Sequence, residues 1–384
     1  RPGSWRRMRG YSLRTAGRRA RGMEGGAPPE GRSRSRNAML ACGALSMVGL
    51  ILLWPSTAAT GQPSPTLRGV GAPPTRVEIA LVADLDEGNR VEGSGKPLWR
   101  SVLQRATLVK DEASGAWGVE WGVSTELQSA HNEAGRGMEL SELVVWDGEL
   151  LAVDDRTGII YSVKDLERVV PLYITMEGDG DTDKGQKSEW ATVKDGKLYV
   201  GSFGKEYVNA ADGTVTNTNN MWVTVVSPDG SKVHEDWTTR YDALRAVTHT
   251  AYPGYMIQEA ILWSASLRKW LVLPRRVSTE PYNDVADEKR GSNILLVASE
   301  DFSDVKRVEV TTLIPERGFS SAAEMPVPYG AVTSALVCLR SAENAEKGTQ
   351  DTYLSILALD GSGPIMAEVE VPGHMKFEGV EVIG

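Results

Sequence analysis

One local layout recurs along this chain and restricts its fold more than any other feature. In Gly135–Tyr161 a short polar cluster leads into an apolar strand, Leu143–Trp146. Asp147-Gly148 then makes a two-residue hairpin turn, because both residue types tolerate positive φ, and a second strand returns over Leu150–Val153. Strands that pair through tight turns and carry charges at their ends are typical of β-propeller blades.

The layout returns four more times. Related passages begin at Lys187, Ile257, Gly318 and Lys376, and each has a polar residue near the start of its strand. The polar residues that begin the five copies are separated by 48, 70, 61 and 58 residues; they are Ser141, Glu189, Glu259, Ser320 and Glu378. Five units over residues 76–384 average about 62 residues, enough for four strands and their loops. The sequence therefore predicts an all-β, five-bladed β-propeller in which the strand Arg76–Asp84 completes the last blade.

Charge is distributed unevenly along the chain. Residues 1–37 hold eleven Arg and two Glu, a net charge of +9, whereas the whole chain carries −9, so residues 38–384 carry −18. A body this acidic repels phosphates in general, which argues against a nucleic-acid partner and suits a protein that recruits cations. The two cysteines, Cys42 and Cys338, predict neither a disulfide framework nor a cysteine metal cluster.

The first 75 residues are expected to lie outside the propeller. Residues 1–37 are predicted to be a basic disordered tail, and residues 55–75 a linker. Between them, Ala38–Trp54 is an uncharged, mostly apolar stretch whose helix would span roughly 25 Å. The Arg cluster before it predicts a type II signal anchor, with residues 76–384 in the lumen of the endoplasmic reticulum or Golgi. The alternative is a cleaved signal peptide, which would give a secreted body.

The five polar residues that begin the copies are expected to meet around a central channel, where the inner strands of a propeller converge. Glu189, Glu259 and Glu378, with the hydroxyls of Ser141 and Ser320, make an oxygen-only donor set. Such a set suits Ca²⁺ and does not suit zinc. The alternative is that these side chains only form hydrogen bonds at the blade starts.

Arg275-Arg276 is the strongest candidate for binding an anion. The pair ends a predicted strand in an acidic body, and guanidinium groups match phosphate oxygens in bidentate fashion. The alternative is a solvated strand end that pairs with nearby acids. None of the four His residues has metal-ligand spacing, and the sequence has no G-x-S-x-G or P-loop motif, so serine-hydrolase and P-loop chemistry lack support.

Long stretches of residues 76–384 resemble the calcium-activated nucleotidases, or soluble apyrases. The matching sequence segments, in chain order, include IALVADLD, GRGMELS, VDDRTGIIY, KSEW, PGYMIQEA, LPRR, RGFSS and KFEG. The resemblance implies a Ca²⁺-dependent five-bladed propeller that hydrolyses nucleoside diphosphates and prefers UDP and GDP to ATP. The family's calcium ligands fall on the five repeat positions, and Glu142 replaces the Asp that usually follows the residue at Ser141. The resemblance also implies a location, since vertebrate members of the family are signal-anchored in the endoplasmic reticulum or Golgi or are secreted, in agreement with the leader.

That activity suggests roles for the charged strand ends. Ca²⁺ would polarise the terminal phosphorus, while Arg156, Arg275 and Arg276 would hold non-bridging oxygens. The residue that orients the attacking water would be one of four carboxylates, among which the sequence does not choose: Asp84, Asp86, Asp154 and Asp155. Because the transition state of phosphoryl transfer is loose, positioning and charge matter more than a strong base.

Two other classes of protein stay open. Another Ca²⁺-dependent propeller hydrolase, such as a lactonase, would not need the arginine pair and would ignore UDP. A non-catalytic propeller with a structural ion would bind Ca²⁺ and release no phosphate. The partners expected for a nucleotidase are a nucleoside diphosphate, the membrane through the N-terminal anchor and, in a homodimer, a second copy of the chain.

Overall fold

The computed structural model describes residues 74–209, 212–327, 331–346 and 348–384. The basic tail, the expected signal anchor and nearly all of the expected linker lie outside these residues. Within the described residues, no helix is long and apolar enough to cross a membrane.

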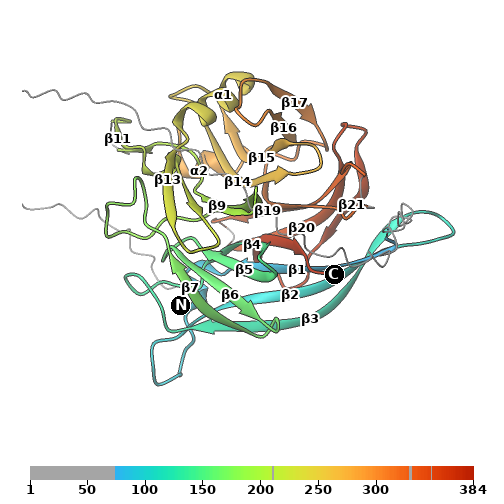
Figure 1. Cartoon of the computed structure of the whole chain (residues 1–384), viewed down its shortest axis with the longest axis horizontal. Coiled ribbons are helices and arrows are strands. Elements are labelled where there is room, and N and C mark those ends of the chain that lie inside the picture. The colour runs from blue at the N-terminus through green and yellow to red at the C-terminus, as the bar shows by residue number, and fades with distance from the viewer. Residues whose placement is uncertain (1–73, 210–211, 328–330, 347) are drawn as a thin grey trace, which may run out of the picture. The chain divides into compact units, whose positions relative to one another are not determined.

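Twenty strands form five four-stranded antiparallel sheets, which confirms the predicted five-bladed propeller (Figure 1). The first sheet consists of β22 (Lys376–Val382), β1 (Arg76–Asp84), β2 (Trp99–Lys110) and β3 (Trp117–Ser129). The second consists of β4 (Leu140–Trp146), β5 (Glu149–Asp154), β6 (Ile159–Lys164) and β7 (Arg168–Ile174). The third consists of β8 (Trp190–Lys194), β9 (Lys197–Gly201), β12 (Trp222–Val226) and β13 (Lys232–Asp236).

The fourth sheet consists of β14 (Tyr255–Ser264), β15 (Lys269–Ser278), β16 (Ile294–Ala298) and β17 (Val305–Glu309). The fifth consists of β18 (Arg317–Glu324), β19 (Ala335–Asn344), β20 (Thr349–Ala358) and β21 (Pro364–Glu370). The connections add a two-stranded sheet and four short helices: β10 (Tyr207–Val208), β11 (Val215–Asn217), α1 (Thr238–Thr248), α2 (Asp284–Asp287), and the 3₁₀ helices η1 (Asp86–Asn89) and η2 (Asn219–Met221).

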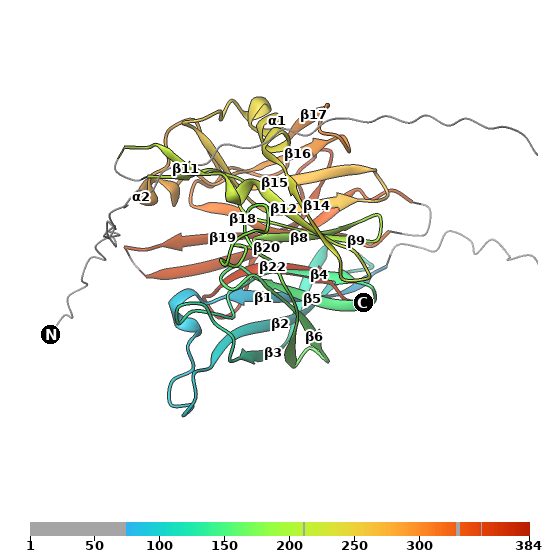
Figure 2. The ribbon, with the colours of Figure 1, turned by 60° about the vertical axis from the view of Figure 1, so that its left-hand side comes forward.

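The last strand of the chain completes the first blade. β22 pairs antiparallel with β1, so the two ends of the body share one sheet, as the sequence predicted (Figure 2). The inner strands contact one another in the closed order β22, β4, β8, β14, β18 and back to β22. Closing the ring in this way leaves no inner strand edge without a neighbouring blade.

The Asp-Gly pairs turn as the sequence predicts. Asp147 and Gly148 have φ values of 50° and 77°, and Asp195 and Gly196 have 51° and 76°. Positive φ at both central residues defines the type I′ turn, whose twist matches that of the strands on either side. These turns join β4 to β5 and β8 to β9 and so fix the register of the inner strands of two blades.

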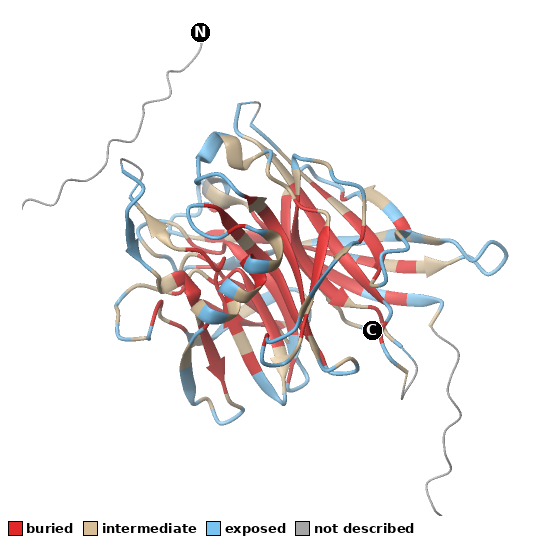
Figure 3. Ribbon diagram, turned by 90° about the horizontal axis from the view of Figure 1, so that it is seen from above, coloured by how far each residue is buried: buried red, intermediate tan, exposed pale blue. Residues whose placement is uncertain are grey.

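The core lies between the blades, where buried residues follow the strands (Figure 3). The largest aromatic cluster joins the third and fourth blades and contains Trp190, Trp237, Trp263 and Trp270. The Trp237 and Trp270 rings meet edge to face with centroids 5.0 Å apart. Such pairs add to the gain from apolar burial.

Candidate active site

Each inner strand carries one extra residue that its neighbour does not pair. In the fourth blade, for example, Gln258 pairs with Pro274 and Ala260 with Leu273, so Glu259 forms a β-bulge. In the third blade Glu189 donates its N–H to the carbonyl of Gly201, which Trp190 also faces. The extra residues are the five repeat positions of the sequence: Ser141, Glu189, Glu259, Ser320 and Glu378. A bulge redirects the side chain of the extra residue, and here the same device recurs in all five blades.

Three of these residues line a cavity of about 760 Å³. One group of carboxylates in its lining includes the three repeat positions: Asp84, Asp86, Asp155, Glu189, Glu259, Glu343 and Glu378. It also contains a group of aromatic side chains: Phe203, Tyr207, Tyr252, Tyr255 and Tyr282. Seven carboxylates therefore gather in one part of the cavity, and three more line it beside the aromatic group: Glu206, Asp284 and Asp287. Basic side chains occur in both parts.

Lys187 joins two carboxylates from different blades. Its Nζ lies 2.7 Å from Glu189 Oε1 and also contacts Asp155 Oδ2, just after β5. Burial alone would lower the pKa of Lys187, but the two carboxylates outweigh it and raise the pKa. Among the described residues, the other oxygen of Asp155, Oδ1, is buried without a hydrogen-bond partner. An orphaned carboxylate oxygen beside an acidic cavity can accept from a ligand or bind a cation.

Arg275 holds three carboxylates from three blades. One of its terminal nitrogens contacts Glu259 and lies 2.6 Å from Glu378 Oε1, and the other contacts Glu343 near the end of β19. Burial raises the pKa of Glu259 to about 7, against the lowering effect of Arg275. Burial also opposes ionisation of Glu343, but the nearby cations, Arg275 first among them, outweigh it and lower the pKa to about 2. Glu343 is therefore the permanent counter-ion of this arginine.

Lys376 holds the carboxylates at the end of β1. Its Nζ lies 2.6 Å from Asp84 Oδ2, 3.1 Å from Asp86 Oδ1 and 3.5 Å from Glu378 Oε1. Asp84 is almost fully buried, whereas Asp86 is partly exposed. Of the four carboxylates considered for orienting water, the structure thus brings Asp84, Asp86 and Asp155 to the cavity.

Asp154 and Arg156 lie elsewhere. Asp154 is buried and accepts hydrogen bonds from the backbone N–H groups of Met138, Arg156 and Thr157, at 2.9 to 3.0 Å. Burial raises its pKa to about 7. Asp154 therefore supports the turn after β5. Arg156 forms an ion pair with Glu133 at 3.2 Å, and neither Asp154 nor Arg156 lines the cavity.

Glu142 also differs from its neighbours. It pairs normally with Val153, one residue past the bulge, and does not line the cavity. Its Oε1 accepts a hydrogen bond from Ser321 Oγ at 2.7 Å and one from the Leu143 N–H at 2.9 Å. Burial raises its pKa well above the usual range of a glutamate. The contact joins β4 to β18.

The serines and Arg276 occupy supporting places. Ser141 Oγ donates to Glu378 Oε2 at 3.4 Å, and Ser320 Oγ donates to the Phe377 carbonyl at 3.0 Å, so both hydroxyls lie against β22. Arg276 lines the cavity on the side of the aromatic group, and its Nε contacts Asp287 at 3.3 Å. Its terminal nitrogen NH1 is buried and has no hydrogen-bond partner among the described residues.

The donor set at the cavity fits a hard divalent cation. The ion-pair network contains seven carboxylates and three cations, an excess of four negative charges when all are ionised. The orphaned Asp155 oxygen and the serine hydroxyls add further oxygen donors. Oxygen ligands of this kind are what Ca²⁺ takes. A neighbouring group, Asp84, Asp86 and Glu139, has carboxylate oxygens within 4.8 Å of one another.

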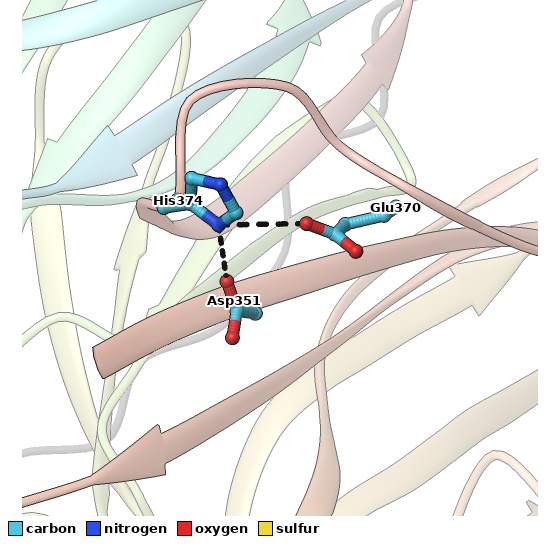
Figure 4. A group of neighbouring side chains, drawn as sticks. All are labelled: Asp351, Glu370 and His374. Atoms are coloured by element: carbon cyan, nitrogen blue, oxygen red, sulfur yellow. Dashed lines mark hydrogen bonds and ion pairs between the residues drawn. The ribbon is translucent and has the colours of Figure 1, made fainter. Parts of the chain in front are cut away.

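A second group of metal-ligand type lies on the fifth blade, away from the cavity (Figure 4). His374 is 78% exposed, and its Nδ1 lies 2.8 Å from Asp351 and 3.5 Å from Glu370. The hydrogen bond to Asp351, with the negative charge of both partners, raises the pKa of His374. A protonated histidine between two carboxylates accounts for this geometry.

Sequence reasoning missed Lys187 and Lys376 as site residues, although a pattern identifies them. Each lies two residues before a bulged glutamate, in Lys187-Ser188-Glu189 and Lys376-Phe377-Glu378. Side chains two residues apart on an extended chain point the same way, so a lysine there meets the acidic cluster. In the fifth blade the equivalent position is Gly318, where a Cβ would lie 2.4 Å from the Arg275 carbonyl oxygen and 2.6 Å from its Cγ. Gly318 leaves the space that Arg275 fills.

Comparison with known proteins identifies the family of the chain. The family model for apyrase matches residues 85–383. The chain is 42% identical over 309 residues to soluble calcium-activated nucleotidase 1 of Mus musculus, covering 80% of this chain and 74% of that protein. It is 37% identical over 305 residues to apyrase apy-1 of Caenorhabditis elegans (79% and 83% covered) and 35% identical over 311 residues to an apyrase of Cimex lectularius (80% and 83%). With its five-bladed fold and its match across nearly the whole propeller, the chain belongs to the apyrase family.

Proposed function

We propose that this protein is a Ca²⁺-dependent hydrolase of nucleoside diphosphates. It prefers UDP and GDP, acts less well on triphosphates, and releases a nucleoside monophosphate and phosphate. Membership of the apyrase family supports a nucleotide-hydrolysing enzyme, and the name of the mouse relative, a calcium-activated nucleotidase, supports the ion. One observation carries the proposal: the glutamates at the repeat positions line the same cavity as buried Arg275, which contacts two of them.

The residues that would hold Ca²⁺ are the five repeat positions, here called the bulged ring: Ser141, Glu189, Glu259, Ser320 and Glu378. The three glutamates line the cavity, and the two serine hydroxyls lie behind them against β22. Glu142 would support the site by accepting the hydrogen bond of Ser321, which joins β4 to β18, because its side chain does not line the cavity. When bound, Ca²⁺ would supply Lewis-acid polarisation of the diphosphate and offset charge on the leaving nucleoside monophosphate.

The basic residues of the cavity would bind the substrate's phosphates. Arg275 and Arg276 follow one another on β15, and both line the cavity, so their guanidinium groups can hold non-bridging oxygens in a fixed geometry. Asp84, Asp86 or Asp155 would orient a water molecule toward the terminal phosphorus and accept its proton. The bond between that phosphorus and the bridging oxygen breaks as the water oxygen bonds to it, with no covalent enzyme intermediate.

The aromatic group offers a surface for the nucleoside. Phe203 and Tyr207 meet edge to face with ring centroids 5.9 Å apart, and Tyr255 and Tyr282 do the same at 5.3 Å. Rings at the wall of a cavity stack on a base with little sequence preference. This arrangement supports a substrate with a phosphate end and an aromatic end.

A pair of variants tests the proposal against its two rivals. We expect Glu189→Gln and Arg275→Met each to lower kcat for UDP by about 100-fold or more, since each removes a charge at the reacting phosphate. Glu309→Gln and Arg307→Met make the same changes on the outer strand β17, where both side chains are exposed, and should keep wild-type activity. Unchanged UDP hydrolysis in either cavity variant would exclude this site. A lactonase would tolerate the loss of Arg275, and a binding module would show no turnover from the start.

The location of the enzyme is part of the same proposal and rests on the apolar stretch 38–54 and the arginine-rich residues 1–37 before it. The anchor would hold the body on the lumenal side of the endoplasmic reticulum or Golgi membrane, or its cleavage would release the body by secretion. Protease protection in sealed microsomes tests this arrangement. Digestion of the body without detergent would place it on the cytosolic side and contradict the proposal.

A further inference from the structure

The carboxylates that would hold Ca²⁺ are already bound by basic side chains of this protein. Lys187 bridges Glu189 and Asp155, and a single nitrogen of Arg275 bridges Glu259 and Glu378. A nitrogen between two carboxylate oxygens of different blades occupies the place that a shared cation would take. All three glutamates of the bulged ring are engaged in this way.

These ion pairs join different blades. Asp155 follows β5 of the second blade and Glu189 precedes β8 of the third, so Lys187 links two blades. Arg275 on β15 reaches Glu378 on β22, which belongs to the first blade. The basic side chains therefore perform the cross-linking that an ion at the centre of the ring would also perform.

A divalent ion and these side chains compete for the same oxygens. The network has more carboxylates than cations, so an added ion is favourable overall, but each ring glutamate must exchange a basic partner for the ion. A lysine or arginine that loses its carboxylate inside a cavity needs another anion. Arg275 keeps Glu343 as a partner, whereas Lys187 keeps only Asp155.

We propose that Lys187 and Arg275 are exchangeable counter-ions of the Ca²⁺ site that turn from its glutamates to the phosphate oxygens of the substrate when Ca²⁺ binds. The inference rests on the proposed function. It assigns Lys187 a positioning role and explains how one ion prepares the cavity for an anion. The exchange also requires reciprocal coupling between Ca²⁺ and the substrate. Each of the two ligands favours the conformation in which Lys187 and Arg275 face the phosphate oxygens, so each should tighten the binding of the other.

Lys187 gives the sharper test, because its side chain is 36% exposed, whereas buried Arg275 secures three acids, two of them buried. In Lys187→Met the ring glutamate no longer has a competing ammonium, so we expect the protein to bind Ca²⁺ about tenfold more tightly on its own. A methylene-bridged analogue of UDP should tighten Ca²⁺ binding by wild-type protein, and this gain should be smaller in the variant, where only Arg275 and the ion itself still couple the two ligands. Calorimetric titration of Ca²⁺ into the full chain, with and without the analogue, measures both quantities.

Two variants control for effects of general charge and of folding. Lys205→Met removes an ammonium from the same cavity, but that ammonium bonds the Glu206 carbonyl at 3.2 Å and lies 4.4 Å from the Tyr282 ring centroid, away from the ring glutamates. Its effect on Ca²⁺ affinity alone should stay within about twofold. Lys187→Arg keeps the competing charge and should retain wild-type affinity.

The outcomes separate the inference from the proposed function. Tighter Ca²⁺ binding by Lys187→Met, with wild-type affinity in Lys187→Arg, would support the exchange. Ca²⁺ binding by wild type with equal or weaker binding by Lys187→Met would overturn the exchange and leave the proposed function standing. The same gain in Lys205→Met would also overturn it, because bulk charge would then explain the effect. No Ca²⁺ binding by wild type would overturn the proposed function itself.

Discussion

Adding one methyl group at Gly318 should damage both stability and activity. A Cβ at this position would lie 2.4 Å from the Arg275 carbonyl oxygen and 2.6 Å from Arg275 Cγ. Ordinary contacts of a Cβ begin at about 3.4 Å, so β18 and the Arg275 end of β15 must separate by roughly 1 Å in Gly318→Ala. Overpacking of this kind costs about 1–3 kcal/mol, and the movement shifts the guanidinium that holds Glu259 and Glu378.

Urea unfolding and steady-state phosphate release measure the two effects. The matched control is Gly118→Ala on β3, where a Cβ would meet no described heavy atom within 4 Å. That change should be neutral or stabilise the protein by up to about 1 kcal/mol, since glycine weakens a strand. Gly318→Ala should lower the free energy of unfolding and reduce kcat by about tenfold or more. Wild-type stability and turnover in Gly318→Ala would refute the packing argument for Arg275.

Three further predictions follow from the buried and exposed charges. Arg275→Met leaves three acids of the cavity without their shared partner, so urea unfolding should show a loss of about 3–5 kcal/mol, and a loss below about 1 kcal/mol would contradict the network. Glu142→Gln keeps the size of a side chain whose pKa burial raises, so calorimetry should show unchanged Ca²⁺ affinity, whereas a large loss would make Glu142 a direct ligand. The folded-state pKa of His374 is raised by its hydrogen bond to Asp351, so its stabilising effect is present below the unfolded-state pKa and lost as pH rises through the folded value. His374→Gln should therefore melt about 1 °C below wild type near pH 5.5 and at the same temperature as wild type near pH 9. A loss of melting temperature at pH 9 but not at pH 5.5 would refute the ion pair.

The propeller could be predicted because its main determinants are local. A polar residue at the start of an apolar inner strand repeats five times, two of the copies turn at Asp-Gly, and a repeat of this length corresponds to one blade. Closure by the terminal strands also follows from sequence. The last copy, from Lys376, contains a single strand, which therefore has to pair with the N-terminal strand to form a blade.

The site could be predicted only in part, because a shift of one residue decides where a strand side chain points. The bulge at Ser141 turns that side chain toward β22 and leaves Glu142 in register, bonded to Ser321. Asp154 and Asp155 are adjacent in the same way: one caps a turn, and the other meets Lys187. Residue types alone do not reveal which of two neighbours is the extra one.

Long-range partners account for the rest. Glu343 lies outside the repeated pattern and reaches Arg275 only because β19 and β15 belong to blades that adjoin at this cavity. The aromatic group likewise comes from loops and strand ends of the third and fourth blades, such as Tyr207 and Tyr282. No local period predicts contacts of this kind.

Phosphate release from UDP by the full chain, first with Ca²⁺ and then with Mg²⁺ and a Ca²⁺-selective chelator, tests the central claim most directly. We predict release with Ca²⁺ and almost none with Mg²⁺, because the oxygen-rich ring offers the flexible, many-ligand site that Ca²⁺ accepts and Mg²⁺ does not. Equal release under both conditions would contradict the calcium site, and no release under either would contradict the proposed hydrolysis of nucleoside diphosphates.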